Sequence, residues 1–272
     1  MTAGTPPIAL TIAGSDPSGG AGIQADLKTF AALGVYGASV ITALTAQNTR
    51  GVSGVFAIPP DFIAAEFRAV VSDLSVAAIK TGMLGDVATV EMVASLLDNV
   101  KAVPVVVDPV MVATSGDVLL RPEAIDAVRK ALMPRATLVT PNIPEASRLL
   151  DTSEAKTEAE MRAQAEALMR FGCGAVLVKG GHGDGDDVVD ILFDGKKHFA
   201  FRRPRIKTSN THGTGCTLSA AIAANLAMDK PLDAAIADAK AFVWHALSAG
   251  AHMRIGRGEN GPVDHNFALR KS

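Results

Sequence analysis

The sequence predicts an α/β fold in which helices cover both faces of a mainly parallel central sheet. Short apolar segments alternate with helical patterns through most of the chain, which is typical of such folds. The segments Val103–Val107, Ala136–Thr140 and Ala175–Lys179 are rich in β-branched residues, as expected of parallel strands buried on both faces. No repeat, linker or low-complexity block divides the 272 residues, so we expect a single domain.

The individual elements follow from local patterns. Apolar residues at spacings of three and four predict helices, the pair Pro59-Pro60 followed by Asp61 opens one of them, and Asp194-Gly195 predicts a hairpin. The predicted strands are Ile8–Ala13, Ala38–Leu44, Val76–Lys80, Val103–Val107, Ala136–Thr140, Ala175–Lys179, Val188–Phe193 and Lys197–Phe201. The predicted helices are Gly20–Leu33, the one opened by Pro59, Val87–Leu97, Glu123–Leu132, Glu145–Leu149, Glu158–Phe171, Thr214–Ala227 and Leu232–Gly250. Residues 1–6 and about 258–272 are polar tails that we expect to be loosely held.

Composition narrows the possible partners. A net charge of -2 and an isoelectric point near 6.3 favour neither nucleic acid nor a membrane surface, and one Trp and one Tyr leave little aromatic surface for stacking bases. The two cysteines make no disulfide framework. Since neither a signal peptide nor a membrane-spanning run is evident, we expect a cytoplasmic protein with a small-molecule substrate.

Polar and glycine residues gather where the predicted strands end. Ligands of parallel sheets bind at the carboxyl ends of the strands. The first strand is followed by residues 14–22, which hold four glycines but match neither the dinucleotide fingerprint nor a P-loop. Asp108, Glu145 and Lys179 each follow a different strand, and together they favour a metal–phosphate site. Asn142 three residues before Glu145 also fits a helix capping box, a purely structural alternative.

A second candidate site is the turn Gly213-Thr214-Gly215-Cys216 before a predicted helix. A helix N-terminus presents free N–H groups and the positive end of the macrodipole, so the turn predicts binding of a transferring phosphoryl group. The same helix end is expected to lower the pKa of Cys216. Three roles compete for this cysteine: a proton acceptor in phosphoryl transfer, a redox thiol, or a small buried residue.

Two charged residues lie on apolar helix stripes. Asp26 shares a stripe with Ile23, Leu27 and Phe30; it either sits at the edge of that stripe or accepts hydrogen bonds from an amine-bearing substrate. Lys240 lies on the apolar stripe of the last helix, where it either extends outward to solvent or reaches a phosphate or nucleotide.

Taken together, the motifs resemble the hydroxymethylpyrimidine/phosphomethylpyrimidine kinases of thiamine biosynthesis, in the ribokinase-like superfamily. The matching stretches run in order from Ile8 to about Leu226 and are ALTIAGSDPSGGAGIQADLKTF, ITALTAQNT, IKTGMLG, VVVDPVMVATSGD, TPNIPEA, VLVKGGH and NTHGTGCTLSAAIAANLA. The resemblance implies a three-layer α/β/α fold and a homodimer. It also implies two successive phosphorylations by ATP with Mg²⁺, first of 4-amino-5-hydroxymethyl-2-methylpyrimidine and then of its monophosphate.

The resemblance also implies roles for individual residues. Those implied for the anion hole are Gly213, Thr214, Gly215 and Cys216, with Cys216 where most of the superfamily has an aspartate base. The residues implied to bind the pyrimidine are Gly14, Ala21, Asp26, Gln47, Met83 and Val110. Of these, Asp26 and Gln47 would form hydrogen bonds with the aminopyrimidine. Those implied for the nucleotide are Asn142, Glu145, Lys179, Thr214 and Lys240. Those implied for Mg²⁺ are Asp108 and Glu145.

Three other functions compete with this one. A pyridoxal kinase of the same branch shares the cysteine-type anion hole, but Gln47 favours an aminopyrimidine because an amide offers it a donor and an acceptor. A nucleotide sensor without turnover is disfavoured because Asp108, Glu145, Lys179 and Cys216 are all present. A redox protein would need a resolving partner for Cys216, and Cys173 is distant in sequence.

Overall fold

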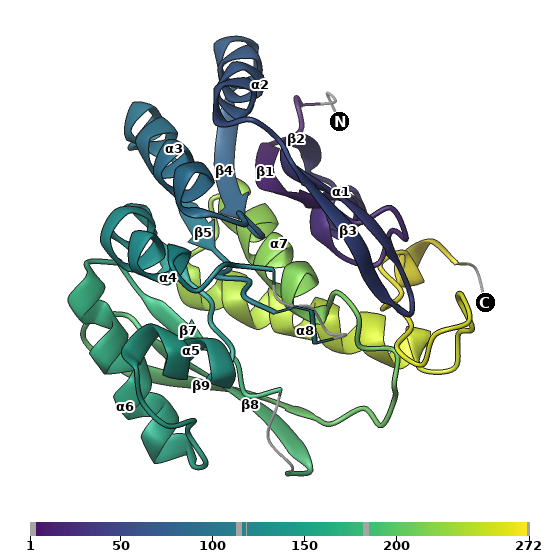
Figure 1. The fold of residues 1–272 in the computed structure, drawn as a ribbon. Coiled ribbons are helices and arrows are strands. Elements are labelled where there is room, and N and C mark those ends of the chain that lie inside the picture. Colours follow the sequence, from purple (N-terminus) through teal and green to yellow (C-terminus); the bar gives the residue numbers. More distant parts are fainter. Residues whose placement is uncertain (1–3, 113–115, 118, 182–184, 271–272) are drawn as a thin grey trace.

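A computed structural model describes residues 4–112, 116–117, 119–181 and 185–270. In this part of the chain, nine strands form one sheet in the order β3-β2-β1-β4-β5-β6-β7-β8-β9 (Figure 1). Strands β2, β1, β4, β5, β6 and β7 pair in parallel, whereas β3, β8 and β9 pair antiparallel with their neighbours. The strands are β1 (Ile8–Ser15), β2 (Tyr36–Asn48), β3 (Gly51–Ala57), β4 (Val76–Thr81), β5 (Val105–Val107), β6 (Leu138–Val139), β7 (Val176–Val178), β8 (Asp187–Phe193) and β9 (His198–Pro204).

Eight α-helices of the described chain lie in two layers on the sheet. Helices α2 to α6 pack on one face, and α1, α7 and α8 pack on the other (Figure 1). The predicted α/β/α architecture with a mainly parallel sheet is therefore confirmed. The helices are α1 (Gly22–Ala32), α2 (Pro60–Asp73), α3 (Val87–Leu97), α4 (Ala124–Ala127), α5 (Ile143–Leu150), α6 (Glu158–Leu168), α7 (Thr214–Ala227) and α8 (Leu232–Gly250).

The two layers explain why the central strands are uniformly apolar. Side chains alternate between the faces of a strand. In β5, Val105 and Val107 join the core under α2 to α6, while Val106 joins the core under α7 and α8. Because both faces are covered, each position of the strand must be apolar.

One strand was missed by the sequence prediction. Strand β3 pairs antiparallel with β2 at the edge of the sheet. Its sequence GVSGVFA is interrupted by Gly and Ser and is mostly exposed, so it lacks the alternation that marks a half-buried strand. Backbone pairing with β2 forms this strand without help from a buried face.

The expectation of a loose C-terminal tail is wrong for residues 261–265, which are buried. The His212 N–H donates to the Gly261 carbonyl (3.0 Å), and the Asp264 N–H donates to the Ala246 carbonyl (3.1 Å). His265 lies 2.9 Å from the Thr217 hydroxyl. Hydrogen bonds rather than apolar side chains hold most of this segment, so its composition did not reveal it. Residues 1–3 and 271–272 of the predicted tails lie outside the described part of the chain.

Within the described residues, no helix combines the length and the apolar character that crossing a membrane requires.

Candidate active site

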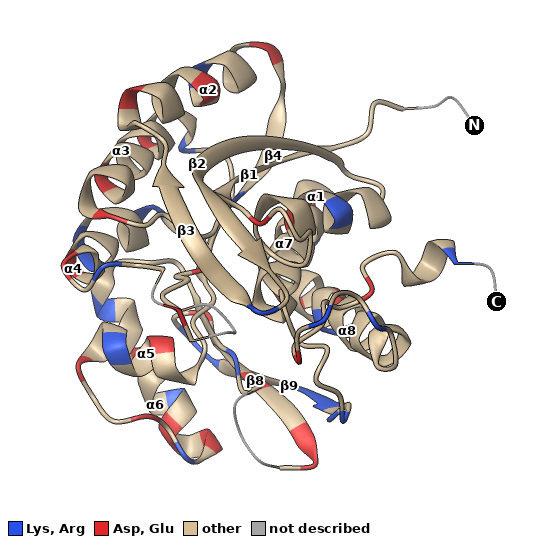
Figure 2. Cartoon of the chain, turned by 45° about the vertical axis from the view of Figure 1, so that its right-hand side comes forward, with Lys and Arg blue, Asp and Glu red and all other residues tan. Residues whose placement is uncertain are grey.

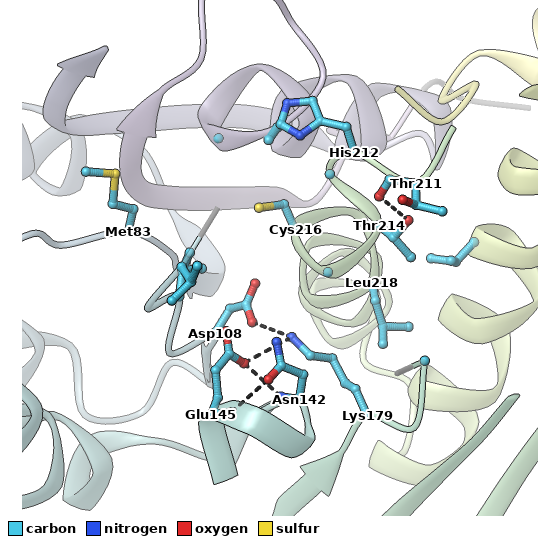
Figure 3. Close-up of a pocket in the computed structure, with 18 of the residues that line it drawn as sticks. Met83, Asp108, Asn142, Glu145, Lys179, Thr211, His212, Thr214, Cys216 and Leu218 are labelled. Carbon is cyan, nitrogen blue, oxygen red and sulfur yellow. Dashed lines mark hydrogen bonds and ion pairs between the residues drawn. The ribbon is translucent and has the colours of Figure 1, made fainter. Parts of the chain in front are cut away.

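A cavity of about 630 Å³ opens at the carboxyl ends of the parallel strands, where ligands of such sheets bind. It brings together 14 of the 15 residues that the sequence and the family resemblance singled out. They are Gly14, Ala21, Gln47, Met83, Asp108, Val110, Asn142, Glu145, Lys179, Gly213, Thr214, Gly215, Cys216 and Lys240. Figure 3 shows Cys216 and His212 on one side of the cavity and Asp108, Glu145, Asn142 and Lys179 on the other.

The floor of the cavity is a cluster of charges at three strand ends. The Lys179 Nζ atom lies 2.7 Å from Asp108 Oδ1 and 3.8 Å from Glu145 Oε2 (Figure 3). The second Asp108 oxygen accepts from the Ser219 hydroxyl of α7 (3.2 Å). Because all three charged side chains are buried, their ionisation depends on one another more than on solvent.

The two carboxyl groups of this cluster differ in pKa. Burial tends to raise the pKa of Asp108, but the ammonium groups of Lys179 and Lys80 outweigh burial and lower it. Burial raises the pKa of Glu145 to about 7, with Lys179 opposing and the Asp108 charge adding to the rise. Near neutral pH, Asp108 is therefore a carboxylate, while Glu145 is poised to gain or lose a proton.

Asn142 and Glu145 also form the capping box that the sequence allowed. The Glu145 N–H donates to Asn142 Oδ1 (2.8 Å), and the Asn142 N–H donates to Glu145 Oε2 (2.7 Å), at the start of α5. The same Glu145 oxygen faces Lys179. The structural role is therefore present, and it holds the carboxyl group toward the cavity rather than away from it.

The opposite side of the cavity is the N-terminus of α7. Gly213 precedes the helix with φ 81°, and a Cβ at this position would collide with the Gly20 carbonyl, so glycine is required there. No side chain caps this helix end. The Thr214 N–H donates to the Thr211 carbonyl just before the helix (3.1 Å). The other N–H groups of the first turn have no acceptor inside the helix and can bind an anion in the cavity.

Cys216 lies in the first turn of α7 and lines the cavity. The expected lowering of its pKa is corrected by the structure. Burial raises the pKa of the thiol to about 11, against the opposing charge of Lys80 and a hydrogen bond from the Gly22 backbone. A thiol with a pKa of about 11 is mainly protonated at neutral pH.

Asp26 is the predicted site residue that does not line the cavity. It is fully buried, accepts from the Thr11 hydroxyl (2.6 Å), and pairs with Lys80 Nζ (2.8 Å). The Asp26 carboxylate outweighs burial and raises the pKa of Lys80. Both contacts fall on Oδ2, and Oδ1 has no hydrogen-bond partner among the described residues. A direct hydrogen bond between the substrate and Asp26 is not supported because Lys80, and not Asp26, lines the cavity.

Lys240 lines the cavity and is buried. It does not extend to solvent. Its Nζ atom lies 2.6 Å from Asp190 Oδ2 in β8, and the other Asp190 oxygen accepts from the Gly180 N–H (2.9 Å). The lysine thus connects α8 to the loop that follows β7.

The donor set fits a magnesium ion that is bound mainly by phosphates. Mg²⁺ usually takes one or two carboxylates together with water and phosphate oxygens. Asp108 and Glu145 supply two carboxyl groups that line the cavity. Among the described residues, no cluster of three or more His, Cys, Asp and Glu side chains could hold a metal ion by itself.

Three residues at the site were missed by sequence reasoning. Lys80 is completely buried. A lysine inside an apolar strand segment was a usable signal in the sequence, because a buried ammonium group needs a partner of opposite charge. Asp16 and His212 lie 196 positions apart but make contact at 2.8 Å in the cavity wall. No local pattern could pair them.

Comparisons with known proteins agree with this geometry. The family model described as phosphomethylpyrimidine kinase matches residues 16–264. The chain is 55% identical over 260 residues to the hydroxymethylpyrimidine/phosphomethylpyrimidine kinase of Rhizobium meliloti, covering 95% of this chain and 96% of that protein. It is 51% identical over 269 residues to the chloroplastic thiamine biosynthetic bifunctional enzyme of Arabidopsis thaliana, covering 97% of this chain and 51% of that enzyme. Among solved structures, an ADP complex of Bacillus subtilis pyridoxal kinase matches with a TM-score of 0.90 and 38% identity, covering 98% of this chain and 100% of the other.

Proposed function

This chain belongs to the phosphomethylpyrimidine kinase family, and we propose that it carries out both phosphorylations expected from its sequence. ATP would phosphorylate the hydroxymethyl group of 4-amino-5-hydroxymethyl-2-methylpyrimidine and then the resulting monophosphate, in thiamine biosynthesis. The observation that carries this proposal is the uncapped N-terminus of α7 facing Asp108 and Lys179 across one cavity. Phosphoryl transfer needs in-line positioning and charge neutralisation more than covalent chemistry.

Each side of the cavity has a part in the transfer. The first-turn N–H groups of α7, from Gly213 to Cys216, would hold the transferring phosphoryl group. Lys179 would neutralise phosphate charge, and Asn142 and Lys240 would bind the nucleotide. Asp108 and Glu145 would hold Mg²⁺, which supplies further neutralisation of the triphosphate when bound. The alcohol of the substrate would then lie between the residues that bind the pyrimidine and the anion hole at the start of α7.

The neutral thiol of Cys216 suits a site that handles two different nucleophiles. An aspartate at this position would repel a monophosphate, whereas a thiol does not carry that charge. The alcohol of the first substrate must lose a proton, while the monophosphate is already ionised. A protonated thiol cannot accept the proton of the alcohol, so Cys216 would act as a base only through its minor thiolate form. We expect it to assist the first step more than the second.

The wall beside the anion hole would bind the pyrimidine through Gly14, Ala21, Gln47, Met83 and Val110. A second candidate substrate is pyridoxal, because the structural neighbour with a TM-score of 0.90 is a pyridoxal kinase. The 55% identity to a hydroxymethylpyrimidine kinase favours the pyrimidine. An ADP-release assay with the hydroxymethylpyrimidine, pyridoxal and a sugar alcohol side by side tests the choice; a clear preference for pyridoxal would overturn it.

A homodimer is also part of the proposal. Strands β2 and β3 carry no charged residue (Figure 2), and Leu44, Val55 and Phe56 on them are 45%, 52% and 65% exposed. An uncharged apolar edge of this kind is suited to a second copy of the chain. Light scattering should give twice the chain mass for the wild type and the single chain mass for Phe56→Lys. We place this single-domain enzyme in the cytoplasm, where its ATP is supplied.

A further inference from the structure

We propose that a hydrogen-bond chain through Asp16 and His212 fixes the side-chain amide of Gln47, with its carbonyl oxygen facing His212. In this orientation Gln47 selects a substrate by its amino group. Asp16 and His212 are then positioning residues that set specificity without being required to touch the substrate. The inference rests on the proposed function, because it names how that site recognises an aminopyrimidine.

The chain begins at Asp16, which is buried and surrounded by donors. Its Oδ1 accepts from the Ser18 N–H (2.8 Å) and the Ser18 hydroxyl (2.7 Å). Its Oδ2 accepts from the Ala21 N–H (2.9 Å) and lies 2.8 Å from His212 Nε2. Burial tends to raise the pKa of Asp16, but the bonds from His212 and Ser18 lower it to about 2. Asp16 is therefore an acceptor only.

A carboxylate at hydrogen-bond distance decides which nitrogen of His212 carries a proton. A lone pair on Nε2 would face the Asp16 oxygen at 2.8 Å, which is repulsive, so Nε2 must be a donor. This holds for the neutral ring and for the imidazolium alike. The structure places Gln47 Nε2 3.5 Å from the same nitrogen, and two N–H donors cannot bond to each other.

The neighbour on the other side of the amide is Thr45. Its hydroxyl donates to the Ser15 carbonyl (2.8 Å), which can only accept. The single hydroxyl proton is thereby used, yet the structure places a second acceptor, Gln47 Oε1, 3.2 Å from Thr45 Oγ1. This orientation of the amide sets two acceptors against each other at Thr45 and two donors against each other at His212. A half-turn of the amide resolves both mismatches.

The orientation of the Gln47 amide decides which groups of a ligand can form hydrogen bonds with it. After this half-turn, the oxygen of Gln47 lies on the His212 side and an N–H lies on the Thr45 side. An aminopyrimidine presents an N–H donor beside a ring nitrogen acceptor, so its amino group meets the oxygen and its ring nitrogen meets the N–H. Pyridoxal has no amino group and leaves the oxygen unpaired, which is how a polar site rejects a near analogue.

The backbone around His212 keeps the ring in place. A Cβ on Gly20 would collide with the His212 ring, so the close packing depends on a glycine there. The His212 N–H donates to the Gly261 carbonyl of the C-terminal segment (3.0 Å). The imidazole is thus held between two segments from opposite ends of the chain, as positioning requires.

Steady-state kinetics test the hydrogen-bond chain. We expect Thr45→Val and His212→Leu each to raise KM for the hydroxymethylpyrimidine about 3- to 10-fold, the effect of one lost hydrogen bond. KM for ATP should stay within about twofold. Thr45→Ser and His212→Gln keep the acceptor and the donor and should recover most of the affinity. Thermal melting of each variant confirms that it is folded.

A double-mutant cycle separates positioning from a structural role. In a Gln47→Met background, the same two substitutions should raise KM by no more than about twofold, because the amide that they orient is gone. Effects that multiply undiminished in that background would overturn the proposal.

Nitrogen NMR of the wild-type protein provides a readout that needs no turnover. The expected result is a proton on His212 Nε2, and a neutral ring protonated only on Nδ1 would overturn the proposal. The proposed function and the hydrogen-bond chain can be refuted independently of each other. If the wild type does not phosphorylate the pyrimidine, the proposed function is wrong, while the NMR result still decides whether the hydrogen-bond chain exists.

Discussion

Glu145 should make the stability of the protein fall as pH rises through neutrality. Its folded-state pKa is about 7 against an ordinary value of 4.5, and its side chain is buried. Between these values the folded protein binds more protons than the unfolded chain. The stabilisation is therefore fully present below pH 4.5 and is lost as pH rises through about 7. This is the reverse of the usual behaviour of a carboxyl group in an ion pair.

The size of the effect follows from the two pKa values. The full difference corresponds to about 3 kcal/mol, of which about 2.5 kcal/mol falls between pH 5 and pH 8. Glu145→Gln removes the titrating group but keeps an oxygen that can accept from the Asn142 N–H, so the capping box of α5 survives. We expect the variant to gain stability relative to wild type by about that amount across this range.

Urea unfolding of the wild type and Glu145→Gln at several pH values measures the difference directly. Glu91→Gln on the exposed side of α3 is a matched control for the loss of a glutamate. The reasoning is refuted if the stability difference between wild type and Glu145→Gln stays constant from pH 5 to pH 8. A difference that changes in the opposite direction would show that Lys179 dominates over burial.

Substitutions at Cys216, Gly213 and Lys80 test other parts of the site. Cys216→Ala should slow phosphorylation of the alcohol more than of the monophosphate, and Cys216→Asp should slow the monophosphate step more; equal losses of rate on both substrates would contradict a cysteine that assists mainly the first step. Gly213→Ala should destabilise the protein by about 1–2 kcal/mol or more, because its φ is positive and its Cβ meets the Gly20 carbonyl; unchanged urea unfolding would count against this. Lys80→Met should cost about 3–5 kcal/mol by leaving the buried Asp26 carboxylate unpaired, and the double variant with Asp26→Leu should recover much of it; a single variant as stable as wild type would show that the pair contributes little.

The parts of the fold that follow from apolar patterns were predictable from the sequence. The buried strands β5, β6 and β7 were located, although each is shorter than predicted because its end residues leave the ladder. Helices α7 and α8 were predicted with the bounds that the structure has. Strand β3 and residues 261–265 depend on backbone pairing and on polar contacts with distant segments, which hydrophobic periodicity does not report.

The candidate site was predictable where a residue stands at a strand end or a helix start. Asp108, Lys179 and Cys216 come together because the topology alone brings those positions to one edge. The charge state of Cys216 was mispredicted because burial, which local sequence does not reveal, outweighs the helix end. The contact between Asp26 and the substrate was mispredicted because the partner of Asp26, Lys80, lies 54 positions away in the sequence.

The position of residues 261–265 has a consequence for synthesis of the protein. The cavity wall contains Gly14 from the first strand and His212, whose backbone is held by Gly261. A growing chain therefore cannot form the complete cavity until nearly all of it has left the ribosome, although β1 to β7 can already pair. We expect nascent chains that stop before Gly261 to retain a sheet yet to lack a finished ligand site. Ligands would then act late in biogenesis, on chains that are already almost fully made.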